Sequence, residues 1–82
     1  MTENEWINSG DELSVSSSNV DSIRYVLEEK TLFITYHSGA TYWYKPVSES
    51  MARSLYRADS KGRWRHQNLP NNSTLIKYDR LD

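Results

Sequence analysis

Two neighbouring segments of the chain alternate between apolar and polar residues in the manner of β-strands. Residues 31–36 (TLFITY) and 40–45 (ATYWYK) are rich in β-branched and aromatic side chains, which favour strands. Between them stands His37-Ser38-Gly39. A three-residue hairpin loop needs a left-handed residue at its third position, and glycine fits there without steric cost. The pattern therefore predicts an antiparallel β-hairpin.

The loop length also determines which side chains share a face of this hairpin. With a three-residue loop, Phe33 and Trp43 pair on one face and the other face packs on the core. A two-residue turn at Ser38-Gly39 would instead group Phe33 with Tyr42 and Tyr44. We favour the first register. The pairs that it places on the core face are Leu32–Tyr44, Ile34–Tyr42 and Tyr36–Ala40.

A helix and further strands are predicted around the hairpin. Residues 22–27 alternate around Ile23 and predict a third strand, and residues 74–78 could form a short fourth one. Ser48 is a good N-cap, and Met51, Leu55 and Ala58 recur at helical spacing, which predicts an amphipathic helix over residues 48–59. Residues 61–70 are expected to be ordered but irregular chain.

These elements predict a single small α+β domain. A chain of 82 residues is long enough for one core, here an antiparallel sheet of three or four strands with the 48–59 helix on its inner face. We expect the domain to span residues 15–82. Residues 1–14 are acidic and are expected to form a flexible arm, on which Trp6 and Ile7 are either exposed or docked on the domain.

Composition bears on the protein's environment. The chain has no cysteine, so disulfides and thiolate metal sites are excluded. It shows no signal peptide and no apolar run long enough to cross a membrane. We therefore expect a cytoplasmic protein without membrane association.

The net charge of −1 hides an uneven distribution. Residues 1–12 carry four acids and no base, whereas a short basic series follows the hairpin. Cations along a track with an aromatic among them suit single-stranded nucleic acid, in which phosphates pair with the cations and a base stacks on the ring. The alternative is a solvated helix face, with Glu49 pairing the first arginine and the tryptophan in the core. The candidate binding residues are Arg53, Arg57, Lys61, Arg63, Trp64 and Arg65.

The Phe33–Trp43 pair is a second candidate surface. An exposed aromatic pair on a sheet suggests a protein partner. The alternative is that Trp6 and Ile7, or a second copy of the protein, cover it. The threonines around the pair offer no charge for phosphates.

The sequence gives no pattern for catalysis or for a cofactor. His37 and His66 are the only histidines, and a metal site would need carboxylates from distant segments. The serines at 16–18 have no neighbouring base, and the three glycines are isolated, which excludes a phosphate-binding loop. We therefore expect no enzyme activity, metal or cofactor.

The order and spacing of the motifs resemble the KTSC domain, named from its occurrence at the carboxyl end of some lysyl-tRNA synthetases and also found as a small stand-alone bacterial or phage protein. The resemblance runs from Val15 to about Trp64. The family's hallmark is the Tyr-x-Tyr at Tyr42 and Tyr44, preceded by Leu32-x-Ile34-x-Tyr36 and followed by Ala58-Asp59-Ser60-Lys61-Gly62. After Trp64 the sequence departs from the family's aromatic-rich continuation.

This resemblance implies a binding module without established chemistry, for which RNA is the proposed ligand. Together with the basic series it predicts a non-enzymatic RNA-binding module. The alternative is a protein-interaction or inhibitor module that uses the Phe33 and Trp43 face.

Overall fold

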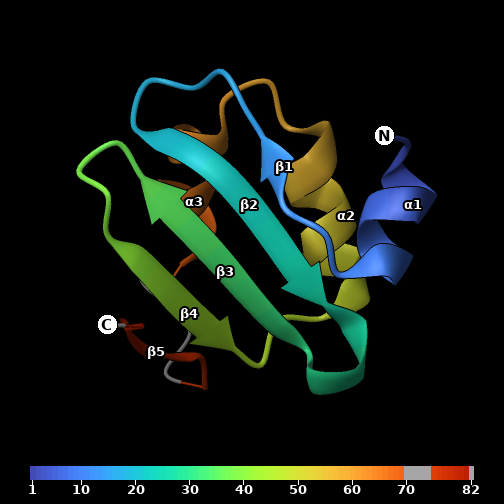
Figure 1. Ribbon diagram of the computed structural model, residues 1–82. Helices are drawn as coiled ribbons and strands as arrows, with labels where there is room; N and C mark the ends of the chain where they lie inside the picture. The colour runs from blue at the N-terminus through green and yellow to red at the C-terminus, as the bar shows by residue number, and fades with distance from the viewer. Residues whose placement is uncertain (70–74, 82) are drawn as a thin grey trace.

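A computed structural model describes residues 1–69 and 75–81, and over them the chain forms an α+β fold. An antiparallel sheet of five strands faces the viewer in Figure 1, with α2 and α3 behind it. The strand order follows the chain order, β1-β2-β3-β4-β5. The elements in sequence are α1 (Glu3–Ser9), β1 (Leu13–Ser14), β2 (Val20–Val26), a 3₁₀ turn (Leu27–Glu29), β3 (Thr31–Tyr36), β4 (Thr41–Lys45), α2 (Glu49–Arg57), α3 (Lys61–Asn68) and β5 (Lys77–Arg80).

The predicted hairpin is confirmed in its register. Leu32 lies opposite Tyr44 and Phe33 opposite Trp43. In the three-residue loop, the Gly39 N–H donates to the Tyr36 carbonyl over 2.8 Å, and Gly39 has a φ of 93°. This backbone conformation is one that residues with a Cβ avoid. The two-residue turn is therefore excluded.

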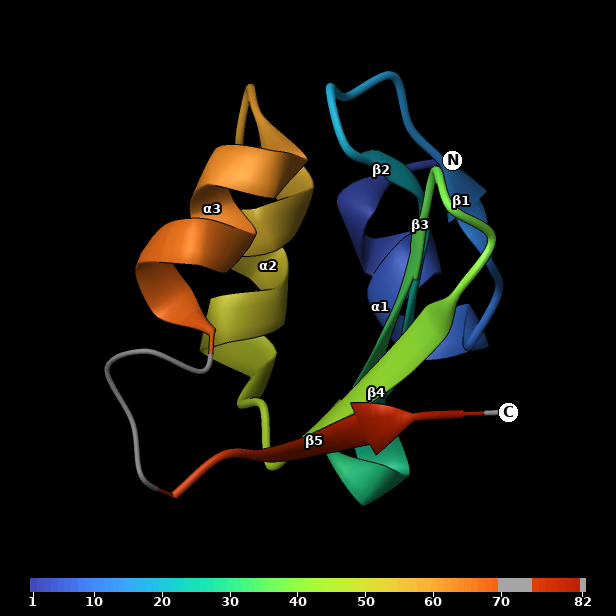
Figure 2. The ribbon, with the colours of Figure 1, turned by 90° about the vertical axis from the view of Figure 1, so that its left-hand side faces the viewer.

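The core lies between the sheet and α2, as predicted. Ser48 caps the helix by accepting a hydrogen bond from the Met51 N–H, and Ala52 and Leu55 are fully buried against the sheet. Figure 2 shows the sheet edge-on, with α2 and α3 together on one side. The described chain nonetheless has three α-helices where one was expected, and its sheet has five strands where three or four were expected.

The amino-terminal segment differs from the expected arm. Thr2 and Glu5 form a capping box that starts α1, and Gly10 ends it with a φ of 73°. Trp6 and Ile7 are buried, and the Trp6 indole N–H donates to the Ile23 carbonyl over 3.2 Å. Because α1 contacts β2 in this way and β1 pairs with β2, residues 3–14 pack as part of the same body as the rest of the chain.

The secondary structure after α2 also differs from the one expected. Residues 61–68, expected to be irregular, form α3 with Ser60 as the N-cap. The last strand, expected over 74–78, is β5 at Lys77–Arg80 and pairs with β4. Residue 70 of the expected irregular segment and residue 74 at the start of the expected strand lie outside the described residues.

Candidate functional site

The first two arginines of the basic series bind acids within the protein. The Glu3 carboxylate accepts hydrogen bonds from Arg57 over 2.6 Å and 2.9 Å and from Arg53 over 2.7 Å. Arg53 also donates to Glu49, the pairing that the solvated-face alternative anticipated. The hydrogen bonds from Arg57 and Arg53 lower the pKa of Glu3. Both guanidinium groups are thus already engaged by carboxylates.

Lys61 and Trp64 have structural contacts. The Lys61 ammonium donates to the carbonyls of Tyr56 and Ala58 over 3.0 Å and 2.5 Å, which satisfies acceptors at the end of α2. Burial lowers the pKa of Lys61. The Trp64 ring is buried and its N–H donates to the Ser54 hydroxyl over 2.6 Å. Stacking of a base on Trp64, expected from the sequence, is therefore not possible in this conformation.

The structure separates the last two arginines of the series. Arg63 is exposed on α3, beside a shallow depression at the junction of α2 and α3. Arg65 is partly buried, and its Nε–H donates to the Tyr36 hydroxyl over 3.1 Å. The series is consequently not one continuous track, and Arg65 belongs to a different site.

That site is a pocket of about 430 Å³ between α3 and the carboxyl-terminal strands, which lie across from each other in Figure 2. We name it the tyrosine–arginine pocket. Asn19 and Ser38 contribute amide and hydroxyl groups to its lining. Its aromatic and charged lining consists of Tyr36, Tyr42, Tyr44, Tyr78, Arg65 and Arg80.

The tyrosines hold one another in fixed positions. The hydroxyls of Tyr36 and Tyr44 lie 2.6 Å apart and share a hydrogen bond. The ring of Tyr78 stacks on that of Tyr44, with centroids 5.9 Å apart and planes 19° apart, and Tyr42 meets Tyr36 edge-on at 5.9 Å. Because Tyr78 is 49% exposed, part of its ring is open to a ligand.

The pocket is positively charged where it contacts α3. Burial raises the pKa of Tyr36, as does its hydrogen bond with Tyr44, so the Tyr36 phenol stays a neutral hydrogen-bonding group near neutral pH. Burial opposes the charged form of Arg65, but hydrogen bonds to Tyr44 and Tyr36 outweigh burial and raise its pKa. Arg65 therefore offers a permanent positive charge inside a concave aromatic site.

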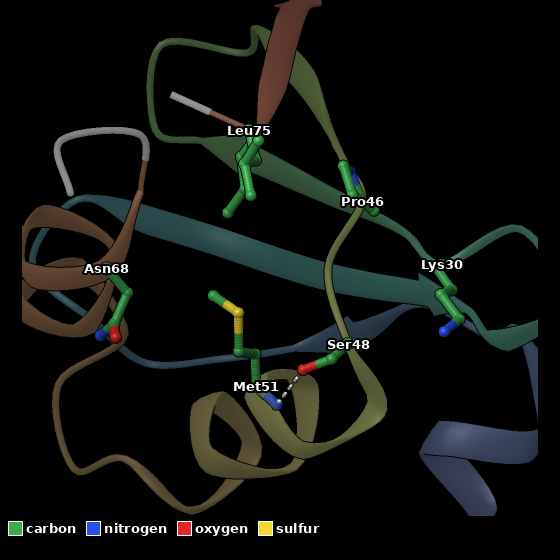
Figure 3. A pocket seen from close by; sticks show the side chains of 7 residues that line it. Lys30, Pro46, Ser48, Met51, Asn68 and Leu75 are labelled. Carbon is green, nitrogen blue, oxygen red and sulfur yellow. Dashed lines mark hydrogen bonds between the residues drawn. The ribbon is translucent and has the colours of Figure 1, made fainter. Parts of the chain in front are cut away.

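A second concavity is apolar and includes Asn68, the last residue of α3, in its lining. Met51 from α2 and Leu75 from the segment before β5 point toward each other across it, with Lys30 and Asn68 on opposite sides (Figure 3). Its volume is about 480 Å³. Lys30 is the one charged residue in its described lining, so this groove offers an apolar surface without groups for chemistry.

Phe33 and Trp43 pair on the outer face of the sheet but are only partly exposed. Trp6 and Ile7 do not cover them, since both are buried on the side of α2, where the Trp6 ring contacts Tyr56. Instead the Arg24 guanidinium lies 4.9 Å above the Phe33 ring. The proposed cover by the amino-terminal residues is thus wrong, and the pair remains a candidate protein contact.

Over residues 1–69 and 75–81, no group of three or more His, Cys, Asp or Glu side chains is arranged to hold a metal ion. The Nε2 atom of His37, in the hairpin loop, lies 3.1 Å from the Oδ1 atom of Asp21. None of the helices in this part of the chain is long and apolar enough to span a membrane.

Arg65 belongs to the basic series seen in the sequence, but no pattern of residues placed it with the tyrosines. The alternation of the hairpin put Tyr36, Tyr42 and Tyr44 on one face, which was one available signal. The other components, Tyr78 and Arg80, reach the pocket only because β5 pairs with β4, so that Tyr44 lies opposite Tyr78 and Tyr42 opposite Arg80.

Comparisons with known proteins agree with this architecture. The model of the KTSC domain family matches residues 16–72, which is more than half of the chain. A solved structure of a KTSC domain protein from Yersinia pestis is similar, with 26% sequence identity, a TM-score of 0.79 and coverage of 88% of this chain and 97% of that one. Among curated proteins none matches the sequence. Both tyrosines of the Tyr-x-Tyr motif line one pocket. From the match of the family model, the chain belongs to the KTSC domain family.

Proposed function

We propose that this chain binds single-stranded RNA through the tyrosine–arginine pocket and catalyses no reaction. The observation that carries the proposal is the convergence of four phenol rings and two guanidinium groups on one concavity of about 430 Å³. Pockets of roughly 300–1,000 Å³ are the usual size for small ligands, and a single nucleotide is a ligand of that kind.

The two kinds of group in the pocket suit the two parts of a nucleotide. An unpaired base stacks on an aromatic ring, and a guanidinium binds phosphate oxygens through paired hydrogen bonds. Tyr78 presents a partly exposed ring supported from behind by Tyr44. Arg65 and Arg80 line the same pocket and would contact the phosphates on either side of the stacked base.

The polar lining favours RNA over DNA. The hydroxyls of Tyr36 and Ser38 and the amide of Asn19 line the pocket together. Such groups can exchange hydrogen bonds with the ribose 2′-hydroxyl, which DNA lacks. Weaker binding of a DNA strand of the same sequence is therefore expected.

The number of phosphates contacted distinguishes this site from the basic series expected from the sequence. For single strands, the logarithm of the affinity falls with the logarithm of the salt concentration by about 0.7 for each phosphate neutralised. Two arginines predict a slope of about −1.4, whereas five cations would give roughly −3.5. Fluorescence anisotropy with short labelled oligoribonucleotides over a range of salt concentrations measures this slope.

A pair of matched variants tests the location of the site. Arg65→Gln is expected to weaken RNA binding about tenfold, since hydrogen bonds to charged groups contribute roughly 1.5–3 kcal/mol. Arg57→Gln removes the same charge from an arginine already paired with Glu3, and its affinity should match that of the wild type. Equal losses in both variants, or no loss in Arg65→Gln, would show that the pocket is not the RNA site.

The aromatic contribution has its own test. Tyr78→Ala is expected to cost about 1–3 kcal/mol of binding free energy, the usual contribution of one stacked base. Tyr78→Phe keeps the ring and should retain most of the affinity. If Phe and Ala weaken binding equally, the ring of Tyr78 does not stack on the ligand.

A further inference from the structure

The strand β5 forms one edge of the sheet and carries much of the exposed apolar surface. Among the described residues four large hydrophobic side chains are exposed, and three of them belong to β5 or its flanks. These are Leu75, Tyr78 and Leu81, at 77%, 49% and 58% exposure. β4 pairs with one side of β5, and within the described chain no strand pairs with the other. Such an edge can pair with a further strand.

The backbone of β5 presents hydrogen-bonding groups on this side. The Leu81 N–H donates to the Thr41 carbonyl over 2.8 Å, so residues 77, 79 and 81 direct their backbone groups toward β4 and residues 78 and 80 direct theirs away from it. In agreement, the Arg80 N–H is bonded to the Asp79 carboxylate over 2.7 Å instead of to β4.

The side chains around Tyr78 are symmetric in their chemistry. Lys77 and Asp79 flank it with opposite charges, and Leu75 and Leu81 stand three residues away on either side. When two such strands pair antiparallel about Tyr78, each Lys77 lies opposite an Asp79 of the other copy. The two Tyr78 residues then face each other.

We propose that two copies of this chain associate through β5, edge to edge, with the two-fold axis at Tyr78. The charges select this register. Moving the centre of the pairing to residue 79 would set Asp79 against Asp79, and moving it to residue 77 would set Lys77 against Lys77, and like charges placed directly opposite are destabilising. On pairing, the Ile76 carbonyl of the second copy replaces the Asp79 carboxylate at the Arg80 N–H, which releases Asp79 for the partner's Lys77.

The association would join the two sheets into one and bring two tyrosine–arginine pockets close together. The two-fold axis is perpendicular to the sheet, so both pockets open on the same face. Tyr78 and Arg80 line the pocket and belong to the pairing strand. A dimer would therefore hold two nucleotide sites on one surface, and two linked sites bind one strand more tightly than either alone. The dimer itself does not depend on the proposed RNA binding.

Charge reversal tests this interface in the absence of RNA, by sedimentation equilibrium over a range of protein concentrations. The wild type is expected to show a monomer–dimer equilibrium. Lys77→Asp and Asp79→Lys each replace two attractive pairs by two repulsive ones, so each should weaken self-association about tenfold or more. Both residues are exposed, and circular dichroism checks that both variants fold.

Recombining the charges provides the control. An equal mixture of the two single variants restores opposite charges at every pair and should form heterodimers. The double variant Lys77→Asp/Asp79→Lys should dimerise like the wild type. A wild type that stays monomeric up to its solubility limit overturns the proposal, as do single variants that dimerise normally or a mixture that does not associate.

Discussion

Some residues of this protein make contacts that could not be predicted from the sequence, and Glu3 is the clearest case. Its carboxylate binds Arg53 and Arg57, which come from positions 50 and 54 residues further along the chain. Two of the arginines expected to contact phosphates therefore fasten α1 to α2. A positively charged helix face is thus not by itself a nucleic-acid site, because an acid from elsewhere in the chain can neutralise it.

The role of Glu3 leads to a pH-dependent prediction. Because the arginines lower the pKa of Glu3 in the folded protein, the unfolded chain binds a proton at this carboxylate more readily than the folded chain does. The stabilisation is therefore complete above the ordinary glutamate pKa and is lost as the pH falls through the lowered value. Glu3→Gln should lower the melting temperature at neutral pH, and the difference from the wild type should shrink in acid.

Thermal unfolding followed by circular dichroism at several pH values measures this difference. Glu28→Gln is the matched control, since it removes the same charge from an exposed residue of the 3₁₀ turn. A Glu3→Gln variant whose melting temperature stays below that of the wild type by the same amount at every pH would contradict the ion-pair explanation.

At the scale of the elements, the sequence predicts what local interactions determine. The register of the hairpin follows from the loop length and from Gly39, and the start of α2 follows from Ser48 and the helical spacing of Leu55. The helix α1 has a capping box at Thr2 and Glu5, which is a readable signal. A seven-residue helix is nonetheless marginal on its own, and it forms here with Trp6 in the core.

The helix α3 and the tyrosine–arginine pocket depend on contacts between distant segments. Trp64 is the one buried residue in α3, so this helix lacks the apolar spacing that revealed α2. The pocket needs Arg65 on that helix and Tyr78 beside Tyr44. Both placements arise from long-range packing, which residue patterns do not report.

The glycines provide a test at this scale. Gly39→Ala should destabilise the protein by about 1–2 kcal/mol, because a residue with a Cβ is strained at positive φ even though no atom lies within 4 Å of the added methyl group. Gly62→Ala places a methyl group 3.7 Å from the Ser18 hydroxyl oxygen, an ordinary contact. It should be neutral or stabilise α3 by up to about 1 kcal/mol.

Urea unfolding of the two variants measures the free energy of unfolding. The comparison is informative because both substitutions add the same group and differ mainly in the backbone conformation. Equal changes in the free energy of unfolding at positions 39 and 62 would mean that the positive φ at position 39 does not disfavour a residue with a Cβ.

At the scale of the whole molecule, acidic and basic residues that are far apart in the sequence come together and neutralise each other in the folded protein. The acidic amino-terminal segment folds back so that Glu3 meets the basic helix. The same segment brings Trp6 into the core, where its ring lies 6.2 Å from Tyr25 and 5.8 Å from Tyr56. A chain of this length has a small core, so α1 is a substantial part of what holds it together.

Truncation of the indole measures that contribution. Trp6→Ala is expected to cost about 3–5 kcal/mol of stability, the usual range for a buried aromatic residue. The total for such a small domain is only about 5–15 kcal/mol. Trp6→Phe keeps a ring but loses the hydrogen bond to Ile23, and should cost less. Denaturant unfolding of both variants tests this, and a wild-type midpoint for Trp6→Ala would mean that α1 does not stabilise the fold.

The agreement between strand order and chain order has a consequence for biosynthesis. The ribosome releases the amino end first, and neighbouring strands such as β2, β3 and β4 can pair as soon as each has emerged, since closing a short loop costs little entropy. The ion pair of Glu3 cannot form until Arg53, 50 residues further along the chain, has been synthesised. Of the three described α-helices, α1 leaves the ribosome before the others but is among the last elements to reach its final place.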